Sequence, residues 1–277
     1  MRIARVDVEG TARFGVVVGD AVRLLDPALT PEILFTLGAD QLLEQNNRST
    51  VEVPIDEVAL LAPTPAPSKI VCVGLNYRDH ANESGQAPPE QPLLFSKPPS
   101  AIVGPGVAVR LPGDLTHEVD WEAELAVVVG GELDGENAAD CLERVFGYTA
   151  ANDVTARDLQ FSDGQWFRGK GLNTFCPVGP HIVTADEFGD PQRKKVRAFV
   201  NGTCMQDSPT SDMIFPIGFL LSWISRQIRL YPGDLLLTGT PPGVGAFRTP
   251  PVFLRAGDVV EVDVEGVGIL RSPVSSR

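Results

Sequence analysis

The sequence predicts an α+β protein that is mostly β, with short strands and short helices beside them. Its 277 residues include 24 prolines and 27 glycines, which indicates many turns. Apolar and polar residues alternate through residues 2–25, and turn residues at 9–10 and 19–20 divide this segment into an antiparallel meander. Hairpin signals recur at residues 196–202 and 257–264. We therefore expect a small β-rich N-terminal domain followed by a larger unit.

A proline-rich stretch, A-P-T-P-A-P-S-K, ends the N-terminal part of the chain. Such a stretch is stiff and extended, which is typical of a connector between domains. The sequence thus predicts an N-terminal domain at residues 1–62, a linker at 63–69 and the main domain at 70–277. Within the first domain, Thr30 followed by Pro31 predicts a helix to about Leu37, and Leu42 and Leu43 indicate a second helix.

Composition excludes several classes of function. Hydrophobic residues make up 43% and charged residues 21%, as in a soluble globular protein. The formal charge of -13 opposes binding to nucleic acid or to an anionic membrane. No secretory signal or membrane-spanning run is present, so a cytoplasmic location is expected. The four cysteines are scattered without C-x-x-C pairing and are interpreted as small buried residues.

Two glutamates open the apolar segment V-D-W-E-A-E-L-A-V-V-V-G at residues 119–130, which we expect to be one strand. Because strand side chains alternate faces, Glu122 and Glu124 share one side with Ala126 and Val128. At a rise of about 3.3 Å per residue the two glutamates lie roughly 7 Å apart, close enough to hold a divalent cation between them. The alternative is a pair of solvated glutamates on an exposed strand face.

His80 is the candidate general base among three histidines. If its segment is helical, Glu83 lies one turn further on, where its carboxylate can orient the imidazole. The alternatives are a surface pair at these positions, or His117 as the functional histidine. His181 lies in a strand-like segment and is interpreted as structural.

Four further polar or charged residues are candidates for binding a cation or a ligand. Asp153, at the junction of an expected strand and helix, either caps that helix or supplies a third ligand for the cation. Arg157 and Gln160 would share one face of the helix. Lys170 lies in a glycine-flanked segment that could aim it at a ligand, and the alternative is a solvated loop lysine.

Further elements follow from local pattern alone. We expect buried strands at 70–73 and 235–237, and a short strand at 95–97 that ends in a lysine. A short helix is expected at 138–144, and a longer apolar helix at 213–228.

In order and spacing, these motifs resemble the fumarylacetoacetate hydrolase superfamily, in the form with a C-terminal catalytic domain and a small N-terminal extension. The resemblance covers about residues 69–270 and rests on V-G-L-N-Y-R-D-H, D-W-E-A-E-L-A, G-Y-T-A-A-N-D-V-T-A-R-D-L-Q, F-R-G-K-G, P-V-G-P and P-G-D-L-L-L-T-G-T-P-P-G-V-G. It implies a mixed β-roll or sandwich with short flanking helices, assembled as a homodimer.

The resemblance also implies roles for individual residues. It implies a metal site for Mg²⁺ or Mn²⁺ at Glu122, Glu124 and Asp153, a water-activating pair at His80 and Glu83, and substrate-facing positions at Arg157, Gln160, Lys170 and Thr240. One residue departs from the family: Asn173 stands where aspartate is common, which would remove a charge near Lys170.

Together these features predict a metal-dependent enzyme that acts on 2-oxo or 2,4-dioxo acids through a stabilised enolate. Hydrolysis of a carbon-carbon bond in an acylpyruvate is the expected reaction. Isomerisation of a 2-hydroxyhepta-2,4-diene-1,7-dioate, as in aromatic compound catabolism, and decarboxylation of oxaloacetate are alternatives at the same site. A non-catalytic binding module is a more distant alternative.

Overall fold

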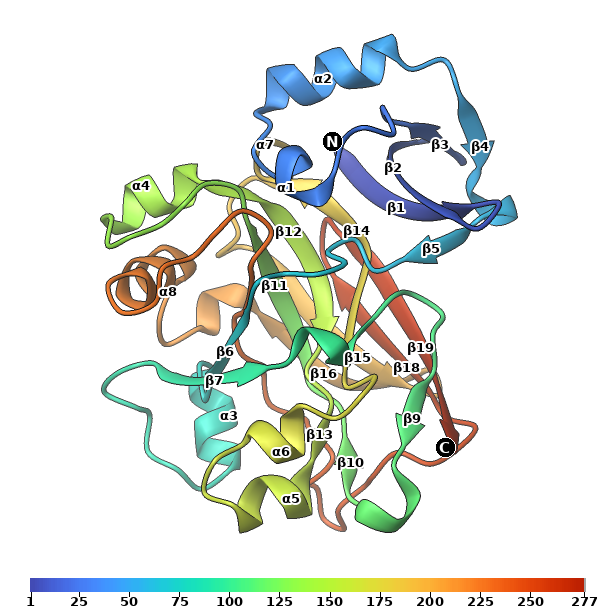
Figure 1. The fold of residues 1–277 in the computed structure, drawn as a ribbon. Helices are drawn as coiled ribbons and strands as arrows, with labels where there is room; N and C mark the ends of the chain where they lie inside the picture. The colour runs from blue at the N-terminus through green and yellow to red at the C-terminus, as the bar shows by residue number, and fades with distance from the viewer. Residues whose placement is uncertain (277) are drawn as a thin grey trace.

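The computed structural model describes residues 1–276, which fold mostly into short β-strands arranged in mixed sheets (Figure 1). The largest sheet has twelve strands, ten of them in the order β4-β3-β2-β1-β14-β12-β11-β17-β6-β7, while β5 pairs with β1 and β8 with β14. Its strands are β1 Arg2–Val8, β2 Thr11–Val18, β3 Ala21–Leu24, β4 Glu52–Pro54, β5 Ala59–Leu61, β6 Ile70–Gly74, β7 Leu93–Lys97, β8 Ile102–Val103, β11 Ala123–Val129, β12 Val145–Asn152, β14 Cys176–Thr184 and β17 Leu235–Leu237.

A second sheet of five strands has the order β16-β15-β18-β19-β9. Asn201 and Gly202, with φ of 52° and 77°, form the tight turn between β15 and β16 that the Asn-Gly pair predicts. Its strands are β9 Val109–Leu111, β15 Lys195–Val200, β16 Thr203–Pro209, β18 Val259–Val264 and β19 Gly268–Ser276, and a separate two-stranded ladder joins β10 Val119–Asp120 to β13 Thr155–Ala156.

Short helices flank the sheets, and the longest of them, α2, has ten residues. In the described part of the chain, no helix combines the length and apolar character that crossing a membrane requires. The helices are α1 Pro31–Leu34, α2 Ala39–Arg48, α3 Arg78–Glu83, α4 Ala138–Glu143, α5 Arg157–Ser162, α6 Phe167–Lys170, α7 Ala185–Phe188 and α8 Ile217–Ser225, with 3-10 turns at η1 Ile55–Glu57, η2 Pro99–Ala101, η3 Gly113–Leu115 and η4 Thr210–Asp212.

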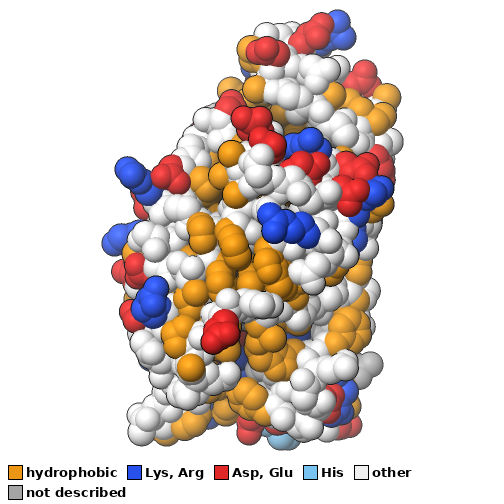
Figure 2. Space-filling model, turned by 90° about the vertical axis from the view of Figure 1, so that its left-hand side faces the viewer, with side chains coloured by type: hydrophobic (Ala, Val, Ile, Leu, Met, Phe, Trp, Pro, Cys, Tyr) orange, Lys and Arg blue, Asp and Glu red, His pale blue; other side chains and the backbone are white. Residues whose placement is uncertain are grey.

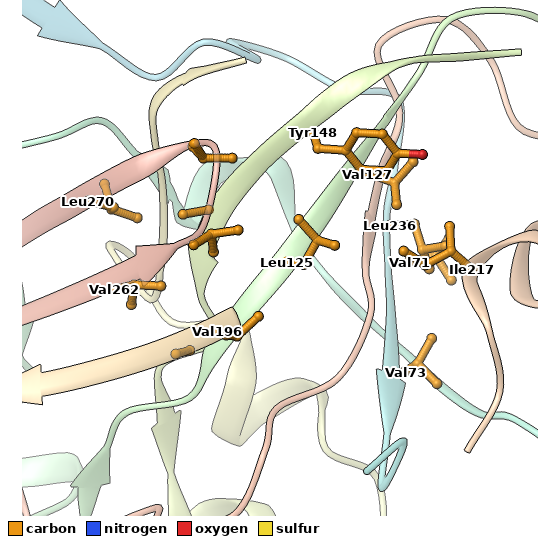
Figure 3. Close-up of a cluster of buried hydrophobic side chains, with 14 of the residues drawn as sticks. Val71, Val73, Leu125, Val127, Tyr148, Val196, Ile217, Leu236, Val262 and Leu270 are labelled. Atoms are coloured by element: carbon orange, nitrogen blue, oxygen red, sulfur yellow. The ribbon is translucent and has the colours of Figure 1, made fainter. Parts of the chain in front are cut away.

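The core lies on both faces of β11, as its alternating sequence predicts. Leu125 and Val127 belong to the same buried cluster as residues of the five-stranded sheet, such as Val262 (Figure 3). Ala126 and Val128, on the opposite face, belong to a second buried cluster that includes residues of the N-terminal strands and of α1 and α2. A strand that is buried on both faces is thereby fixed in register, because a shift of one residue would exchange its two faces.

The N-terminal strands continue the large sheet, because β1 pairs with β14 at Arg2 and Val183. Figure 1 shows β1 to β5, α1 and α2 at one end of the molecule, and α3, α5 and α6 at the opposite end. The predicted boundary at residues 63–69 remains a prediction. The architecture as a whole, mostly β with short helices around mixed sheets, is the fold class that the sequence predicted.

Two helices are shorter than expected. The helix expected over 31–37 ends at Leu34, and the helix expected over 213–228 begins only at Ile217 and ends at Ser225. Pro216 holds the N-cap position in an extended conformation, and Met213 forms a β-bridge with Tyr77, so the residues before Pro216 are held outside the helix.

One face of the molecule carries a broad band of apolar side chains (Figure 2). It is the side of Figure 1 on which α4 and α8 lie. Phe219 on α8 is 41% exposed and stacks on Phe215, with ring centroids 5.6 Å apart.

Candidate metal centre and active site

Three buried carboxylates from two neighbouring strands converge at one end of the large sheet. Glu122 precedes β11, Glu124 lies within it, and Asp153 follows β12. The two strands pair with Ala123 opposite Asn152, and the Asp153 amide donates to the Glu122 carbonyl over 2.9 Å. One ligand oxygen from each carboxylate lies within 4.8 Å of the others. The convergence that the sequence analysis expected is therefore present.

The strand expected over 119–130 is interrupted at Trp121 and Glu122, between β10 and β11. Side-chain amides take the place of strand partners here. The Glu122 amide donates to Asn152 Oδ1 over 3.0 Å, and the Ala123 amide donates to Gln206 Oε1 over 2.9 Å. Because the backbone is satisfied in this way, Glu122 can leave the regular ladder and still be buried.

The interpretation of Asp153 as a helix cap is wrong. Helix α5 begins at Arg157, its N-cap is Ala156, and no side chain caps it. The Arg157 amide donates instead to the Glu118 carbonyl over 2.9 Å. A short strand, β13, separates Asp153 from the helix, which leaves the carboxylate free to join the other two.

Two of the three carboxylates, Glu122 and Asp153, form ion pairs with buried cationic side chains. Lys170 Nζ lies 2.7 Å from Glu122 Oε2 and 2.8 Å from Asp153 Oδ2. Arg157 Nη1 lies 2.7 Å from Glu122 Oε1. Burial alone would raise the pKa of Glu122, but the charges of Lys170 and Arg157 outweigh it and lower that pKa to about 2. Glu122 is therefore a carboxylate at neutral pH.

Glu124 differs from the other two carboxylates. It is 1% exposed and accepts a hydrogen bond from the Gly239 amide over 2.7 Å, but within residues 1–276 no cationic side chain pairs with it. Burial, then the charges of Asp153 and Glu122, raise its pKa well above the usual value. A divalent cation among the three would supply the missing charge, and three carboxylates are the hard oxygen donors that Mg²⁺ and Mn²⁺ prefer. The residues present therefore fit such an ion.

His80 and Glu83 lie on α3, and His80 Nδ1 is 3.2 Å from Glu83 Oε2. Both oxygens of Glu83 also accept from the Gly243 amide, over 2.9 and 3.1 Å. Gly243 has φ of 105° and would place a Cβ 2.1 Å from the Met205 carbonyl oxygen, so only glycine fits there. Glu83 thus holds both the imidazole and the loop after β17, and Nε2 of His80 is left for a ligand.

Six of the nine predicted site residues line one cavity, whereas Glu83, Glu124 and Asp153 are not part of its lining. Lys170 is 1% exposed and ends helix α6, so the alternative of a solvated loop lysine is wrong. Arg157 Nη1 donates to Gln160 Oε1 over 3.1 Å, as expected for residues on one helix face. Of the predicted residues, those in contact with this cavity are His80, Glu122, Arg157, Gln160, Lys170 and Thr240.

Sequence reasoning missed three buried residues that organise this site. Lys97, at the end of β7, lies 2.7 Å from Asp153 Oδ1 and also donates to the Lys170 carbonyl. Asp120 accepts from Arg157 Nε over 2.8 Å and from the amides of residues 245 and 246. Gln206 reaches the same region from β16. The available signals were the lysine that ends the strand expected at 95–97 and, for Asp120, a charged residue next to the apolar segment that carries the glutamates.

Other expectations have mixed outcomes. His117 lines a separate cavity of about 690 Å³ that none of the three carboxylates touches, so it does not compete with His80. For His181, burial above all lowers the pKa to about 4, consistent with a structural role. Cys204 is exposed, which contradicts its interpretation as buried, whereas the other three cysteines are buried. Asn173 is exposed, and no hydrogen bond or ion pair links it to Lys170 in the described residues.

The three buried carboxylates, with Lys170 and His80 beside them, form a candidate metal centre, and comparison with known proteins places the chain in a family of enzymes. Residues 69–275 match the family described as fumarylacetoacetate (FAA) hydrolase, C-terminal, and residues 1–63 match the Rv2993c-like N-terminal family. This chain therefore belongs to the fumarylacetoacetate hydrolase family and is an enzyme of that family.

Individual relatives cover most of the chain. It is 48% identical to the mitochondrial oxaloacetate tautomerase Fahd2a of Rattus norvegicus, over 80% of this chain and 71% of the relative. The solved structures that match this chain over its whole length include the following two. The 5-carboxymethyl-2-hydroxymuconate delta-isomerase of Mycobacterium smegmatis has a TM-score of 0.83 at 39% identity over 100% of both chains. The maleylpyruvate hydrolase of Sphingobium sp. SYK-6, in complex with manganese(II) and pyruvate, has a TM-score of 0.82 at 32% identity and is covered to 99%.

Proposed function

We propose that this protein is a divalent-metal-dependent enzyme that converts short 2-oxo acids through their enolates. The observation that carries the proposal is the group of three buried carboxylates whose oxygens lie within 4.8 Å of one another. Four buried carboxylates, Asp120, Glu122, Glu124 and Asp153, meet three buried cations, Lys97, Arg157 and Lys170. The remaining negative charge favours a cation, and Mg²⁺ or Mn²⁺ is the ion we expect.

When bound, the ion supplies Lewis-acid stabilisation of the negative charge that develops on a keto oxygen. The protein's own residues do the rest. Arg157, Thr240 and Gln160 line the cavity. Arg157 and Thr240 would bind the substrate's carboxylate, and Gln160 would restrict the orientation of the substrate. His80 accepts a proton through Nε2, because Glu83 occupies Nδ1. Burial lowers the pKa of Lys170, but the charges of Asp153 and Glu122 raise it by more, so that the pKa lies above its usual value. Lys170 is therefore charged at neutral pH and carries a proton that it can donate.

The reaction that we place first is keto-enol tautomerisation of an oxaloacetate-like acid. His80 takes the proton from the carbon next to the keto group, the electron pair forms the carbon-carbon double bond, and the oxygen takes a proton from Lys170. His80 and Lys170 then exchange protons with water, which restores both groups. The 48% identity to a protein named oxaloacetate tautomerase supports this choice.

The second candidate is hydrolysis of an acylpyruvate, the reaction expected from the sequence. His80 would take a proton from water, and the hydroxide would add to the carbonyl carbon farther from the carboxylate. The carbon-carbon bond then breaks, its electron pair leaves as the enolate of pyruvate, and Lys170 protonates that enolate. The oriented pair of His80 and Glu83 favours this candidate, because activating water requires a positioned base. Isomerisation and decarboxylation would use the same enolate.

Three assays on the same preparation separate these reactions. Loss of the oxaloacetate enol, followed by ultraviolet absorbance, measures tautomerisation. Release of pyruvate from oxaloacetate measures decarboxylation, and release of pyruvate from an acylpyruvate measures hydrolysis. Each is run with Mg²⁺, with Mn²⁺ and after removal of metal by a chelator. If the protein catalyses any of the three reactions and the chelator abolishes that activity, the proposed class of enzyme is supported. If the metal-loaded protein catalyses none of them, the proposal is rejected in favour of a binding module.

We also propose the homodimer that the family resemblance implies, and a cytoplasmic location. A mass measurement by light scattering tests the first, because a monomer at micromolar concentration would contradict it.

A further inference from the structure

Gln206 connects the strand that carries the glutamates with the loop that carries Thr240. Its side chain is 1% exposed. Oε1 accepts from the Ala123 amide over 2.9 Å, between Glu122 and Glu124 in the chain. Nε2 donates to Thr240 Oγ1 over 2.8 Å and to the Pro241 carbonyl over 2.7 Å. One amide thus makes three hydrogen bonds across segments far apart in the sequence.

The orientation of this amide is determined by its partners. Oxygen and nitrogen of a glutamine are in general assigned from the hydrogen-bond network. Here the network leaves no choice, because the Ala123 amide can only donate and the Pro241 carbonyl can only accept. The NH₂ group of Gln206 must therefore point toward Thr240 and Pro241.

This orientation decides what the Thr240 hydroxyl can do. A hydroxyl has one hydrogen and two acceptor positions. Gln206 fills an acceptor position, so the hydrogen of Thr240 is left to donate. It reaches the Ala123 carbonyl over 2.9 Å, and Thr240 also lines the cavity shared with His80 and Lys170. A carboxylate that enters the cavity would have to take this hydrogen in place of the Ala123 carbonyl.

We propose that Gln206 is a positioning residue that fixes the Thr240 hydroxyl as a hydrogen-bond donor to the substrate's carboxylate. The proposal rests on the proposed function, since it requires an oxo acid in this cavity. Gln206 acts through Thr240 and does not itself line the cavity.

A bulge in β16 turns Gln206 inward. Ala198 pairs with Gln206 but the next residue, Phe199, pairs with Cys204, so Met205 is the extra residue. The Met205 carbonyl accepts from Arg248 Nη2 over 2.8 Å, which fixes the bulge against the loop after β17.

The test compares Gln206→Met, which keeps the length but has no amide to form these hydrogen bonds, with Gln206→Glu, whose carboxylate form keeps an acceptor for Ala123 but has no donor for Thr240. We expect each to raise KM for the oxo acid about ten-fold or more, since a hydrogen bond to a charged group is affected. We expect kcat to change less than about three-fold in both variants, and the Kd for Mg²⁺, measured by calorimetry, to stay within about two-fold in Gln206→Glu, which keeps the acceptor for the Ala123 amide. Ser208→Ala, on the same face of β16, is the matched control and leaves KM unchanged.

A double-mutant comparison separates positioning from packing. If Gln206 acts through Thr240, adding Gln206→Met to Thr240→Val raises KM no further. Additive effects, or a weakened Kd for Mg²⁺ with unchanged KM, would overturn the proposal. Should Gln206→Met fail to fold, Gln206→Glu provides the same comparison.

The outcome for the proposed function is separate, because wild-type turnover decides it. If the wild type converts no oxo acid, pyruvate binding to the Mg²⁺-loaded protein still tests the role of Gln206. Equal pyruvate affinity in the wild type and Gln206→Glu would overturn the inference, and a loss of about ten-fold or more would support it.

Discussion

The ammonium of Lys97 lies 2.7 Å from Oδ1 of Asp153, and the side chains of both residues are fully buried. Lys97 also donates to the carbonyls of Val154 and Lys170, so one lysine holds a metal-ligand candidate and the end of helix α6 together. Without Lys97, the buried Asp153 would keep only Lys170 as a cationic partner, and it shares Lys170 with Glu122.

Lys97→Met should therefore destabilise the metal-free protein strongly. We expect the free energy of unfolding to fall by about 3 to 5 kcal/mol, as is typical for loss of one member of a buried ion pair. Urea denaturation measures the change. Arg48→Met, which breaks the exposed pair of Arg48 with Glu44, is the control and should cost less than about 1 kcal/mol. A loss for Lys97→Met no larger than that of the control would contradict this account.

Glu124→Gln should have opposite effects on metal affinity and on stability. The change removes a buried carboxylate that has no cationic partner in residues 1–276, while an amide oxygen can still accept from the Gly239 amide. We expect the affinity for Mg²⁺ to fall by about 100-fold, the upper end of the loss that is typical when a residue supporting a metal's ligands is mutated. The melting temperature without metal should stay equal or rise, because an amide avoids the cost of burying an acid beside Asp153 and Glu122, the cost that raises the pKa of Glu124. Calorimetry and thermal unfolding measure the two effects, and unchanged Mg²⁺ affinity would remove Glu124 from the site.

His80→Ala should lower the rate of either proposed reaction by about 10²-fold to 10⁴-fold, the usual contribution of a general base. The Kd for Mg²⁺ should not change, because His80 is not one of the three carboxylate ligands. His117→Ala is the matched control, since His117 lines a different cavity, and should retain activity. Steady-state kinetics on the reactive oxo acid decide the matter, and full activity in His80→Ala would show that another group is the base.

His181 should make stability depend on pH between about 6.5 and 4. Burial, together with the charge of Arg2, lowers its pKa to about 4 in the folded protein, whereas the unfolded value is near 6.5. The unfolded state therefore binds the proton first as pH falls, and the free energy of unfolding decreases through this window by up to about 3 kcal/mol. Above pH 7 His181 contributes no such change. His181→Gln should flatten the difference in stability between pH 7 and pH 4.5, measured by urea denaturation, and an identical pH profile in the variant would contradict the assignment.

Local pattern predicted most elements because their signals are short in range. The alternation in β11 placed Glu122 and Glu124 on the same side as Ala126 and Val128, and those two apolar residues do lie in one buried cluster while Leu125 and Val127 lie in another. The Asn-Gly turn was also predicted correctly, and the helix that the pairing of His80 with Glu83 requires is present. Periodicity and turn chemistry act over a few residues, which a sequence displays directly.

The errors arose where tertiary contacts override local preference. Asp153 has the side chain of a good helix cap, yet the pairing of β12 with β11 places it beside Glu122, and the chain forms β13 before the helix begins. Met213 continues the apolar helical pattern, yet its bridge to Tyr77 holds it outside α8. Such contacts join residues that a local window does not contain.

The sequence by itself determined the mostly β fold class and the family, and it placed Glu122 and Glu124 on one side of a strand. The role of Asp153 stayed open in the local pattern and was implied only by the family resemblance. The order and spacing of the motifs carry this information, because strand alternation and helical spacing follow from backbone geometry. Only the tertiary structure decided which side chains hold these residues in place. Asp120 meets the Gly245 amide across 125 positions, and Gln206 meets Ala123 across 83. Nothing local marks these partners, since a buried polar group takes whichever donor or acceptor the packed chain brings to it.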